Sequence, residues 1–246
     1  MDLAFSRDEG WGARANLGLI VLQTDETLEN ELRSLTLPQG TALHHTRIES
    51  DLQVTAETLM QMKENLTKSA SMLPSSKAYD VIGFGCTSGS TVIGTTEVAK
   101  AVQKAHPRAK VTNPAEAVLA ALRSLNIKKV GLVSPYIAEV SDALCDLLRK
   151  NQIEPVAVGS FGQSEEAIVT QISDQSVEDA ICKIGQNPEV EAVFASCTNL
   201  RTFKVIEACE KKIGKPVISS NQALVWHMLK QAGLETSGQG PGQLFT

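Results

Sequence analysis

Two cysteines of the sequence stand in the same local context. Cys86 follows the apolar run Tyr79–Gly85, and Cys197 follows the apolar run Val190–Ser196. A threonine comes directly after each cysteine. A thiol can act as a general acid, a general base or a nucleophile. Two thiols in one site would place a reactive group on each face of a bound carbon acid, so the repeated context predicts paired acid/base chemistry at these two positions.

Burial in the core is the alternative explanation for both thiols, since cysteine is among the most buried residue types. Their matched surroundings favour the functional interpretation. The other three cysteines lie within helical patterns among apolar neighbours and are interpreted as structural: Cys145, Cys182 and Cys209. Five cysteines without a CxxC pair are typical of reduced thiols, which predicts a cytoplasmic protein.

Apolar, β-branched runs alternate along the chain with segments of helical spacing. This alternation is typical of parallel α/β sheets whose strands are buried on both faces. We predict four strands in each half: Leu17–Leu22, Ala42–Ile48, Tyr79–Gly85 and Ala109–Thr112, then Lys129–Ser134, Glu154–Ser160, Val190–Ser196 and Pro216–Ser219. The expected helices are Thr27–Leu35, Val54–Met72, Ser90–Ala105, Pro114–Leu125, Ala138–Asn151, Val177–Gly185, Phe203–Ile213 and Gln222–Ala232.

These elements place both cysteines at the carboxyl end of the third strand of a half. Ligands of parallel α/β sheets bind at that end. A helix starting right after each cysteine would aim free N–H groups at the site, lower the thiol pKa and hold a carboxylate. The sequence therefore predicts a cleft between two related lobes, with a thiol on each side.

Composition excludes several other classes of function. The 246 residues carry a formal net charge of −5, and only 4% are aromatic. No basic footprint or stacking platform for nucleic acid is present. No apolar run approaches the roughly 20 residues of a membrane helix, and no signal peptide is apparent. Metal-binding Cys/His spacing, a dinucleotide fingerprint and a Walker-type loop are all missing.

At these residues the sequence resembles the aspartate/glutamate racemase superfamily and, within it, the maleate cis–trans isomerase and arylmalonate decarboxylase branch. The similarity runs from about Leu17 to Gly233. It is carried by Leu17–Glu29, GCTSGS around Cys86, SPY at Ser134–Tyr136, SCTN-L-R around Cys197, and Lys215–Leu229. It implies two pseudo-symmetric parallel α/β lobes, a small carboxylate substrate, and neither a metal nor an organic cofactor. Proteins labelled for ectoine utilisation belong near this branch.

The resemblance also implies roles for individual residues. Cys86 is similar to the nucleophile of the maleate isomerases and Cys197 to their proton donor, while Tyr136 matches a tyrosine whose hydroxyl meets the substrate carboxylate. Backbone N–H groups are expected to hold the carboxylates at Thr87, Ser88, Thr198 and Asn199. Decarboxylases of the branch keep only the second thiol, so the presence of both favours an isomerase or racemase.

Two loops depart from the isomerase pattern. Gln23 and Asp25 follow the first strand and are expected to contact substrate, but the isomerases carry asparagine where Asp25 stands. An aspartate repels a dianion and suits an ammonium group. Asp25 can also cap the helix that begins at Glu26 or Thr27. In the second half, Phe161–Ser164 replaces a loop that contains another asparagine.

Three functions are open at this point. The first is cis–trans isomerisation of a maleate-like diacid, and the second is racemisation or epimerisation of an amino acid or its derivative. The third is a ligand-binding protein without chemistry, against which the paired thiols argue; a decarboxylase is also disfavoured. Arg47, at the end of the second strand, either pairs with a carboxylate or lies in solvent, and His227 is expected to pack in the last helix.

The predicted lobes comprise residues 1–114 and 115–221, with the site between them. A C-terminal helix within 222–246 is expected to pack back on the first lobe. The first 15 residues and the tail after Gly233 are Gly-rich or polar and are expected to be mobile. Surface helices would allow a homo-oligomer.

Overall fold

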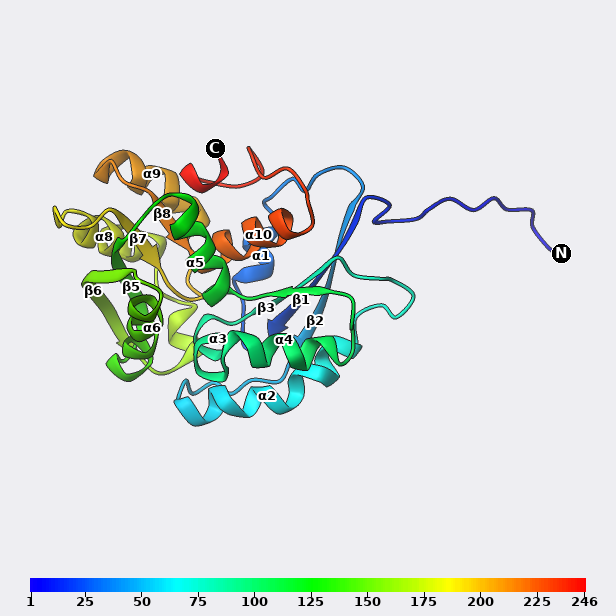
Figure 1. Cartoon of the computed structure of the whole chain (residues 1–246), viewed down its shortest axis with the longest axis horizontal. Helices are drawn as coiled ribbons and strands as arrows, with labels where there is room; N and C mark the ends of the chain where they lie inside the picture. The colour runs from blue at the N-terminus through cyan, green and yellow to red at the C-terminus, as the bar shows by residue number, and fades with distance from the viewer.

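Two four-stranded parallel sheets organise the chain, whose computed structural model describes residues 1–246 (Figure 1). The first sheet has the order β2-β1-β3-β4 and the second the order β6-β5-β7-β8. The strands are β1 (Ala15–Leu22), β2 (Thr41–Ile48), β3 (Val81–Gly85), β4 (Lys110–Thr112), β5 (Lys129–Tyr136), β6 (Glu154–Gln163), β7 (Ala192–Ala195) and β8 (Val217–Ser219). The predicted fold class and the assignment of four strands to each half are confirmed.

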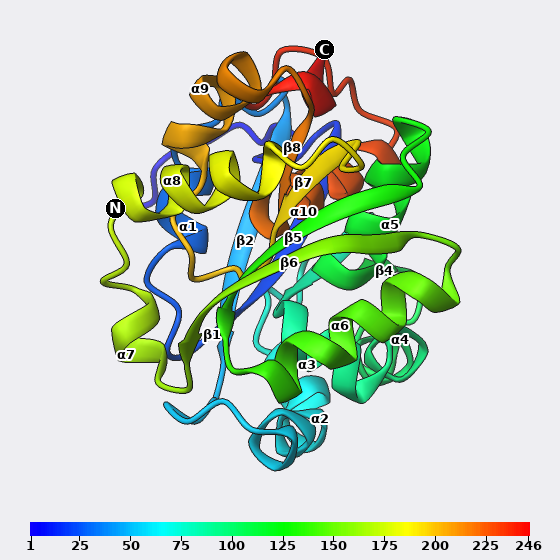
Figure 2. The same cartoon turned by 90° about the vertical axis from the view of Figure 1, so that its left-hand side faces the viewer.

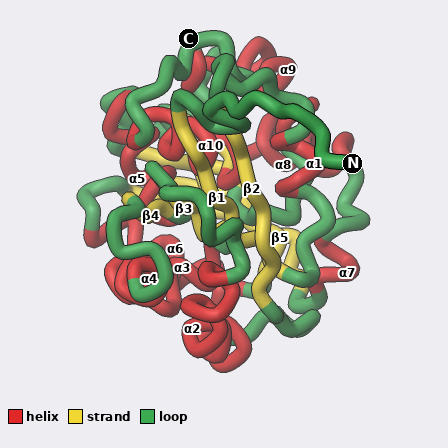
Figure 3. Tube along the Cα trace, turned by 90° about the vertical axis from the view of Figure 1, so that its right-hand side faces the viewer, coloured by secondary structure: helices red, strands yellow, loops and turns green.

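Helices connect the strands and cover both faces of the sheets. They are α1 (Leu28–Leu32), α2 (Ala56–Ser71), α3 (Thr87–Ile93), α4 (Thr95–Gln103), α5 (Pro114–Ser124), α6 (Ala138–Lys150), α7 (Glu166–Val169), α8 (Asp174–Gly185), α9 (Phe203–Ile213) and α10 (Ser220–Gln231), with a short 3-10 turn at Gln243–Phe245. Figure 2 shows α6 and α8 on opposite sides of β5 and β6. Figure 3 shows β1 beside β2, with α2 along the same lobe.

Local sequence explains where several helices begin and end. The Asn113 side chain accepts a hydrogen bond of 3.0 Å from the Glu116 N–H, and Pro114 occupies the first helical position of α5. The helix predicted over Ser90–Ala105 is two helices, α3 and α4, because the chain turns at Gly94 with φ 91°. Positive φ is a conformation that glycine adopts without steric cost.

The strand order explains where a site can form. In each lobe the chain passes from the central strand, β1 or β5, to one edge and then returns to the other side at β3 or β7. Helices that leave neighbouring strands in opposite directions open a crevice at the carboxyl ends. The loops after β1 and β3, and those after β5 and β7, therefore face the same region.

The C-terminal part of the chain packs onto the rest of the protein. Helix α10 ends at Gln231 and contacts α5, β3 and β4. The tail after Gly233, expected to be mobile, continues as an irregular segment that buries Leu244 and Phe245. The N-terminal segment instead leaves the body in an extended course (Figure 1) and exposes Phe5. The division into lobes at residue 114 stays a prediction.

None of the helices combines the length and the hydrophobicity that crossing a lipid bilayer requires.

Candidate active site

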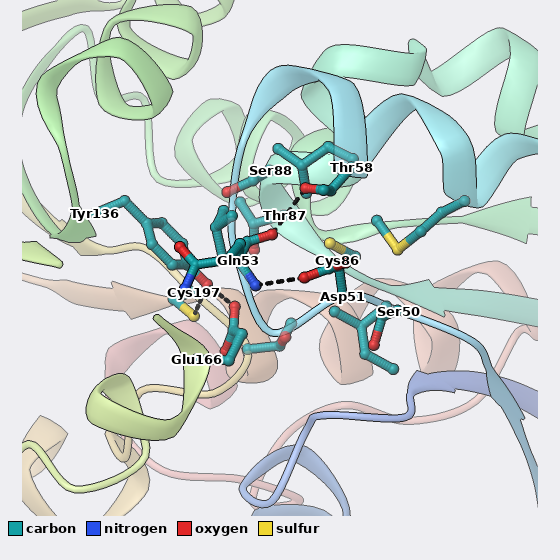
Figure 4. A pocket seen from close by; sticks show the side chains of 15 residues that line it. Ser50, Asp51, Gln53, Thr58, Cys86, Thr87, Ser88, Tyr136, Glu166 and Cys197 are labelled. Carbon is teal, nitrogen blue, oxygen red and sulfur yellow. Dashed lines mark hydrogen bonds between the residues drawn. The ribbon is translucent and has the colours of Figure 1, made fainter. Parts of the chain in front are cut away.

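A small cavity lies between the carboxyl ends of β3 and β7, and the thiols of Cys86 and Cys197 both line it. Figure 4 shows Tyr136 and Glu166 beside Cys197, while Cys86 lies near the start of α3. The cavity volume is about 20 Å³, enough for one water molecule. A substrate therefore needs the surrounding loops to move apart.

Two loops close this cavity from opposite lobes. The Val54 N–H donates to the Ser164 carbonyl, and the Glu166 N–H donates to the Leu52 carbonyl, each at 2.9 Å. These bonds form a short antiparallel bridge in which Gln53 lies opposite Glu165. The two backbone bonds therefore tie the loop after β2 to the segment before α7 beside the cavity.

A helix begins directly after Cys86, as expected, and the Cys86 side chain caps it. Its Sγ accepts a hydrogen bond of 3.2 Å from the Gly89 N–H at the start of α3. Burial nevertheless raises the pKa of the Cys86 thiol to about 12, despite the opposing effect of the Gly89 N–H. The expectation that the helix start lowers the thiol pKa is wrong for the closed cavity, because the loss of solvation outweighs one N–H.

The backbone after Cys197 differs from the expected one. No helix begins there; a turn follows, and α9 starts only at Phe203. Cys197 itself has φ 126°, which is strained for a residue other than glycine. Its Sγ accepts a hydrogen bond of 3.2 Å from the Asn199 N–H. Burial and the nearby Glu166 carboxylate raise the pKa of the Cys197 thiol well above its ordinary value.

Ser220 joins the two cysteine segments, a contact that the sequence analysis missed. Its hydroxyl oxygen accepts hydrogen bonds from the Cys197 N–H at 3.0 Å and from the Thr87 hydroxyl at 2.8 Å. Ser220 is fully buried at the start of α10, directly after β8. The one signal for it was its place inside Lys215–Leu229, a segment that carries the family resemblance.

Glu166 is the second residue that the sequence analysis missed. It is buried, lines the cavity and accepts hydrogen bonds from the Tyr136 hydroxyl at 2.5 Å and from the Asn199 side-chain amide at 2.7 Å. The Tyr136 oxygen also lies 3.0 Å from the Sγ of Cys197. Burial raises the pKa of Glu166, and these two hydrogen bonds oppose the rise. No motif marked Glu166, because it follows a polar loop.

The predicted carboxylate-binding residues divide into two groups. Thr87, Ser88, Tyr136 and Thr198 line the cavity. Asn199 lies behind it, where its side chain bonds the Glu26 N–H at 2.9 Å and the Thr24 carbonyl at 3.1 Å. The Asn199 backbone N–H donates to the Cys197 sulfur, and its side chain also donates to Glu166. Asn199 therefore connects the loop after β1 with Glu166 and Cys197.

Asp25 adopts the capping role that the sequence left open. Its Oδ1 accepts hydrogen bonds from the Thr27 N–H at 2.9 Å and the Leu28 N–H at 2.8 Å, at the start of α1. Its Oδ2 is buried without a partner, and burial raises the pKa of Asp25 to about 6. Asp25 is not among the cavity-lining residues, and Gln23 is exposed outside the cavity. The structure therefore does not bring these two predicted residues to the cavity surface.

No cationic side chain lines the cavity, whereas the carboxylates of Asp51 and Glu166 do. The Arg47 guanidinium donates to the carbonyls of Leu22 and Asp25 and pairs with Glu29. Both alternatives considered for Arg47 describe it in part, because its side chain is exposed and its carboxylate partner is Glu29. No cluster of three or more His, Cys, Asp or Glu is placed to hold a metal ion.

Comparison with known proteins places the chain in a family. The model for the family described as Amdase, arylmalonate decarboxylase, matches residues 40–245, which is most of the sequence. The chain belongs to the arylmalonate decarboxylase family. The predicted superfamily and branch are thereby confirmed, while the expected link to ectoine utilisation finds no support among these relatives.

The relatives of this chain include enzymes with two different activities, arylmalonate decarboxylase and maleate isomerase. An arylmalonate decarboxylase of Bordetella bronchiseptica is 28% identical over 136 residues, which cover 54% of this chain and 57% of that protein. A maleate isomerase of Geobacillus stearothermophilus is 21% identical over 243 residues, covering 94% of this chain and 96% of that protein. The sequence is therefore similar both to an isomerase and to a decarboxylase.

A solved structure supports the fold. A mutant of the Nocardia farcinica maleate cis–trans isomerase, with a covalently bound succinylcysteine intermediate, superposes with a TM-score of 0.86 at 23% identity. The match covers 94% of this chain and 98% of that one. At this identity the likeness shows that the two proteins share a fold.

Proposed function

We propose that this chain is a cofactor-independent isomerase of a small carboxylate, with Cys86 and Cys197 as its two reacting thiols. The observation that carries the proposal is the presence of both thiols in one closed cavity at the carboxyl ends of β3 and β7. Two thiols in one cavity can move a proton, or add and eliminate, on different faces of one substrate.

Cis–trans isomerisation of a maleate-like diacid is the first form of the proposal. The Cys86 sulfur adds to one alkene carbon, so the C–S bond forms as the double bond becomes single. Rotation about that single bond followed by loss of the thiolate gives the trans alkene. Cys197 donates a proton to the other carbon as the C–S bond forms and removes that proton again as the C–S bond breaks, so no net proton is consumed. The succinylcysteine in the Nocardia relative is the product of such an addition, which supports this route.

The protonation state of the cavity constrains this mechanism. Burial holds both thiols in the protonated form at neutral pH while the cavity is closed. A thiolate is needed for addition or for proton abstraction. Each sulfur accepts one backbone N–H bond of 3.2 Å, so the difference comes from Glu166: Cys86 is better placed to lose its proton because Cys197 lies beside the Glu166 carboxylate, which opposes ionisation there. This asymmetry supports Cys86 as nucleophile or base and Cys197 as acid.

Racemisation or epimerisation at the carbon next to a carboxylate is the second form. The same two thiols would act as base on one face and acid on the other. The acidic side chains of Asp51 and Glu166, without a cation among the lining residues, favour this form over a dianionic substrate.

Proton NMR in D₂O separates the two forms. Purified protein is incubated with maleate and, separately, with aspartate, glutamate and diaminobutyrate derivatives. Growth of fumarate from maleate establishes cis–trans isomerisation. Loss of the α-proton signal from an amino acid, with maleate unchanged, establishes racemisation. If no compound in either set reacts or exchanges, the isomerase proposal is wrong for these substrate classes.

A further inference from the structure

Two carboxylates line the cavity, one from each lobe. Glu166, on the second-lobe side, is 4% exposed and lies beside Cys197 and Tyr136, whereas Asp51, on the first-lobe side, is exposed to solvent. Behind this surface lies a second buried acid, Asp25, and the Glu166 carboxylate repels its negative charge. Arg47 cannot compensate, because its guanidinium is bound to backbone carbonyls and Glu29.

Glu166 is held in place but retains capacity to bind. Its Oε1 accepts from Tyr136 and its Oε2 from Asn199, so each oxygen has one known partner. A carboxylate has about four acceptor positions, two on each oxygen. Both donors, the Tyr136 hydroxyl and the Asn199 amide, are buried side chains. Their positions fix the orientation of the carboxylate and of its remaining lone pairs. In the closed form of the cavity Glu166 is thus a buried acceptor whose orientation is fixed by two hydrogen bonds.

A dicarboxylate would add two negative charges to this environment without a positive side chain to meet them. Like charges at short range are unfavourable, and the effect grows as solvent is excluded. A cationic nitrogen next to Glu166 would reverse the sign of that interaction and supply N–H donors to its free lone pairs. At the first-lobe side the acidic residue, Asp51, is exposed to solvent, and Thr87 and Ser88 at the start of α3 are the residues suited to hold the single carboxylate.

We propose that Glu166 is the specificity-determining residue of this site and selects a substrate that bears one carboxylate and one cationic nitrogen. This inference rests on the proposed function in one respect: both place the substrate in the cavity that Cys86 and Cys197 line. It moves the amine-binding role from Asp25, which caps α1 and is not exposed to the cavity, to Glu166. The substrate class is that of small amino acids and their analogues, including those with the amine away from the carboxylate.

Two probes that differ in one group test this selection. Succinate and 3-aminopropanoate have the same carbon spacing, but the second carries an ammonium group in place of one carboxylate. Binding of each to the wild-type protein is measured by isothermal titration calorimetry near neutral pH. We expect 3-aminopropanoate to bind at least about tenfold tighter, because a close charge pair in a desolvated site contributes more than about 1.4 kcal/mol.

The variant Glu166→Gln keeps the size of the side chain and removes its charge. We expect it to lose at least about tenfold in affinity for 3-aminopropanoate and none for succinate. Glu165→Gln is the matched control, because Glu165 is the exposed neighbour in the chain and its side chain does not line the cavity. We expect this control to bind both probes as the wild type does.

Several outcomes would overturn the proposal. Tighter binding of succinate by the wild type would do so, as would no binding of 3-aminopropanoate at millimolar concentration. An equal loss for both probes in Glu166→Gln would show a structural role. Succinate affinity that rises on acidification, and only when Glu166 is present, would show instead that a protonated Glu166 donates to a second carboxylate. Because binding is measured without turnover, selection can succeed while isomerisation fails, or the reverse.

Discussion

The hydroxyl of Thr87 donates a hydrogen bond of 2.8 Å to the hydroxyl of Ser220, inside the protein. Thr87 belongs to the first lobe and follows Cys86 directly. Ser220 begins α10 and also accepts a hydrogen bond from the backbone of Cys197. One serine therefore links the backbones that carry the two thiols, and it limits how far they can move apart.

The variant Ser220→Ala tests this link. Removing the hydroxyl leaves the buried Cys197 N–H without its acceptor, which costs about 1–3 kcal/mol. We expect a lower free energy of unfolding in urea and a fall in kcat, because the strained backbone at Cys197 loses a support. Thr91→Ala is the control, since the Thr91 hydroxyl bonds only a carbonyl within its own helix. Unchanged stability and kcat in Ser220→Ala would contradict this role.

Replacement of either cavity thiol tests the chemistry. We expect Cys86→Ser and Cys197→Ser each to lower turnover by at least about a thousandfold, because a serine hydroxyl is a far weaker acid and nucleophile than a thiol. Cys182→Ser, outside the cavity and half-buried, should retain turnover. The NMR assay provides the measurement. Full activity in either cavity variant would contradict the two-thiol mechanism.

Gly89→Ala tests how closely the helix start approaches Cys86. A Cβ at this position would lie 2.9 Å from the Cys86 Sγ and 2.7 Å from the Met62 Cε. The methionine can move, but the thiol is held at the end of β3. We expect the thiol to shift and kcat to fall by about tenfold or more, as for other small misplacements of a reacting group. Circular dichroism should show an unchanged fold; wild-type kcat would contradict the expected shift.

The buried Asp25 predicts a pH dependence of stability. Its pKa is raised from an ordinary 3.8 to about 6, so the unfolded chain ionises first as the pH rises. Stability is therefore lost between about pH 4 and 6, by up to about 3 kcal/mol, and no further loss from this group occurs above that range.

Urea unfolding of wild type and Asp25→Asn near both ends of this range measures the effect. The amide oxygen can keep the bonds to the Thr27 and Leu28 N–H groups, so the fold should persist. We expect the variant to lose less stability than the wild type as the pH rises. Equal losses in the two proteins would show that Asp25 does not carry this dependence.

The sequence alone determined the fold class and the two thiols. Strand and helix periodicity are local properties, and they located each strand closely enough to place Cys86 and Cys197 at strand ends. The order of elements then required the two ends to face a common crevice. Family resemblance added Tyr136, which the structure places at the same cavity.

Tertiary structure decided the electrostatics and the supporting contacts. Glu166 and Ser220 reach the site from distant segments, and no local pattern indicates that a buried hydrogen bond will form there. The protonation of the thiols also depends on the balance between burial and a few N–H groups, which the helix pattern alone misjudged. Solvent exclusion and charge proximity arise only when separate segments pack together, so they required the folded chain.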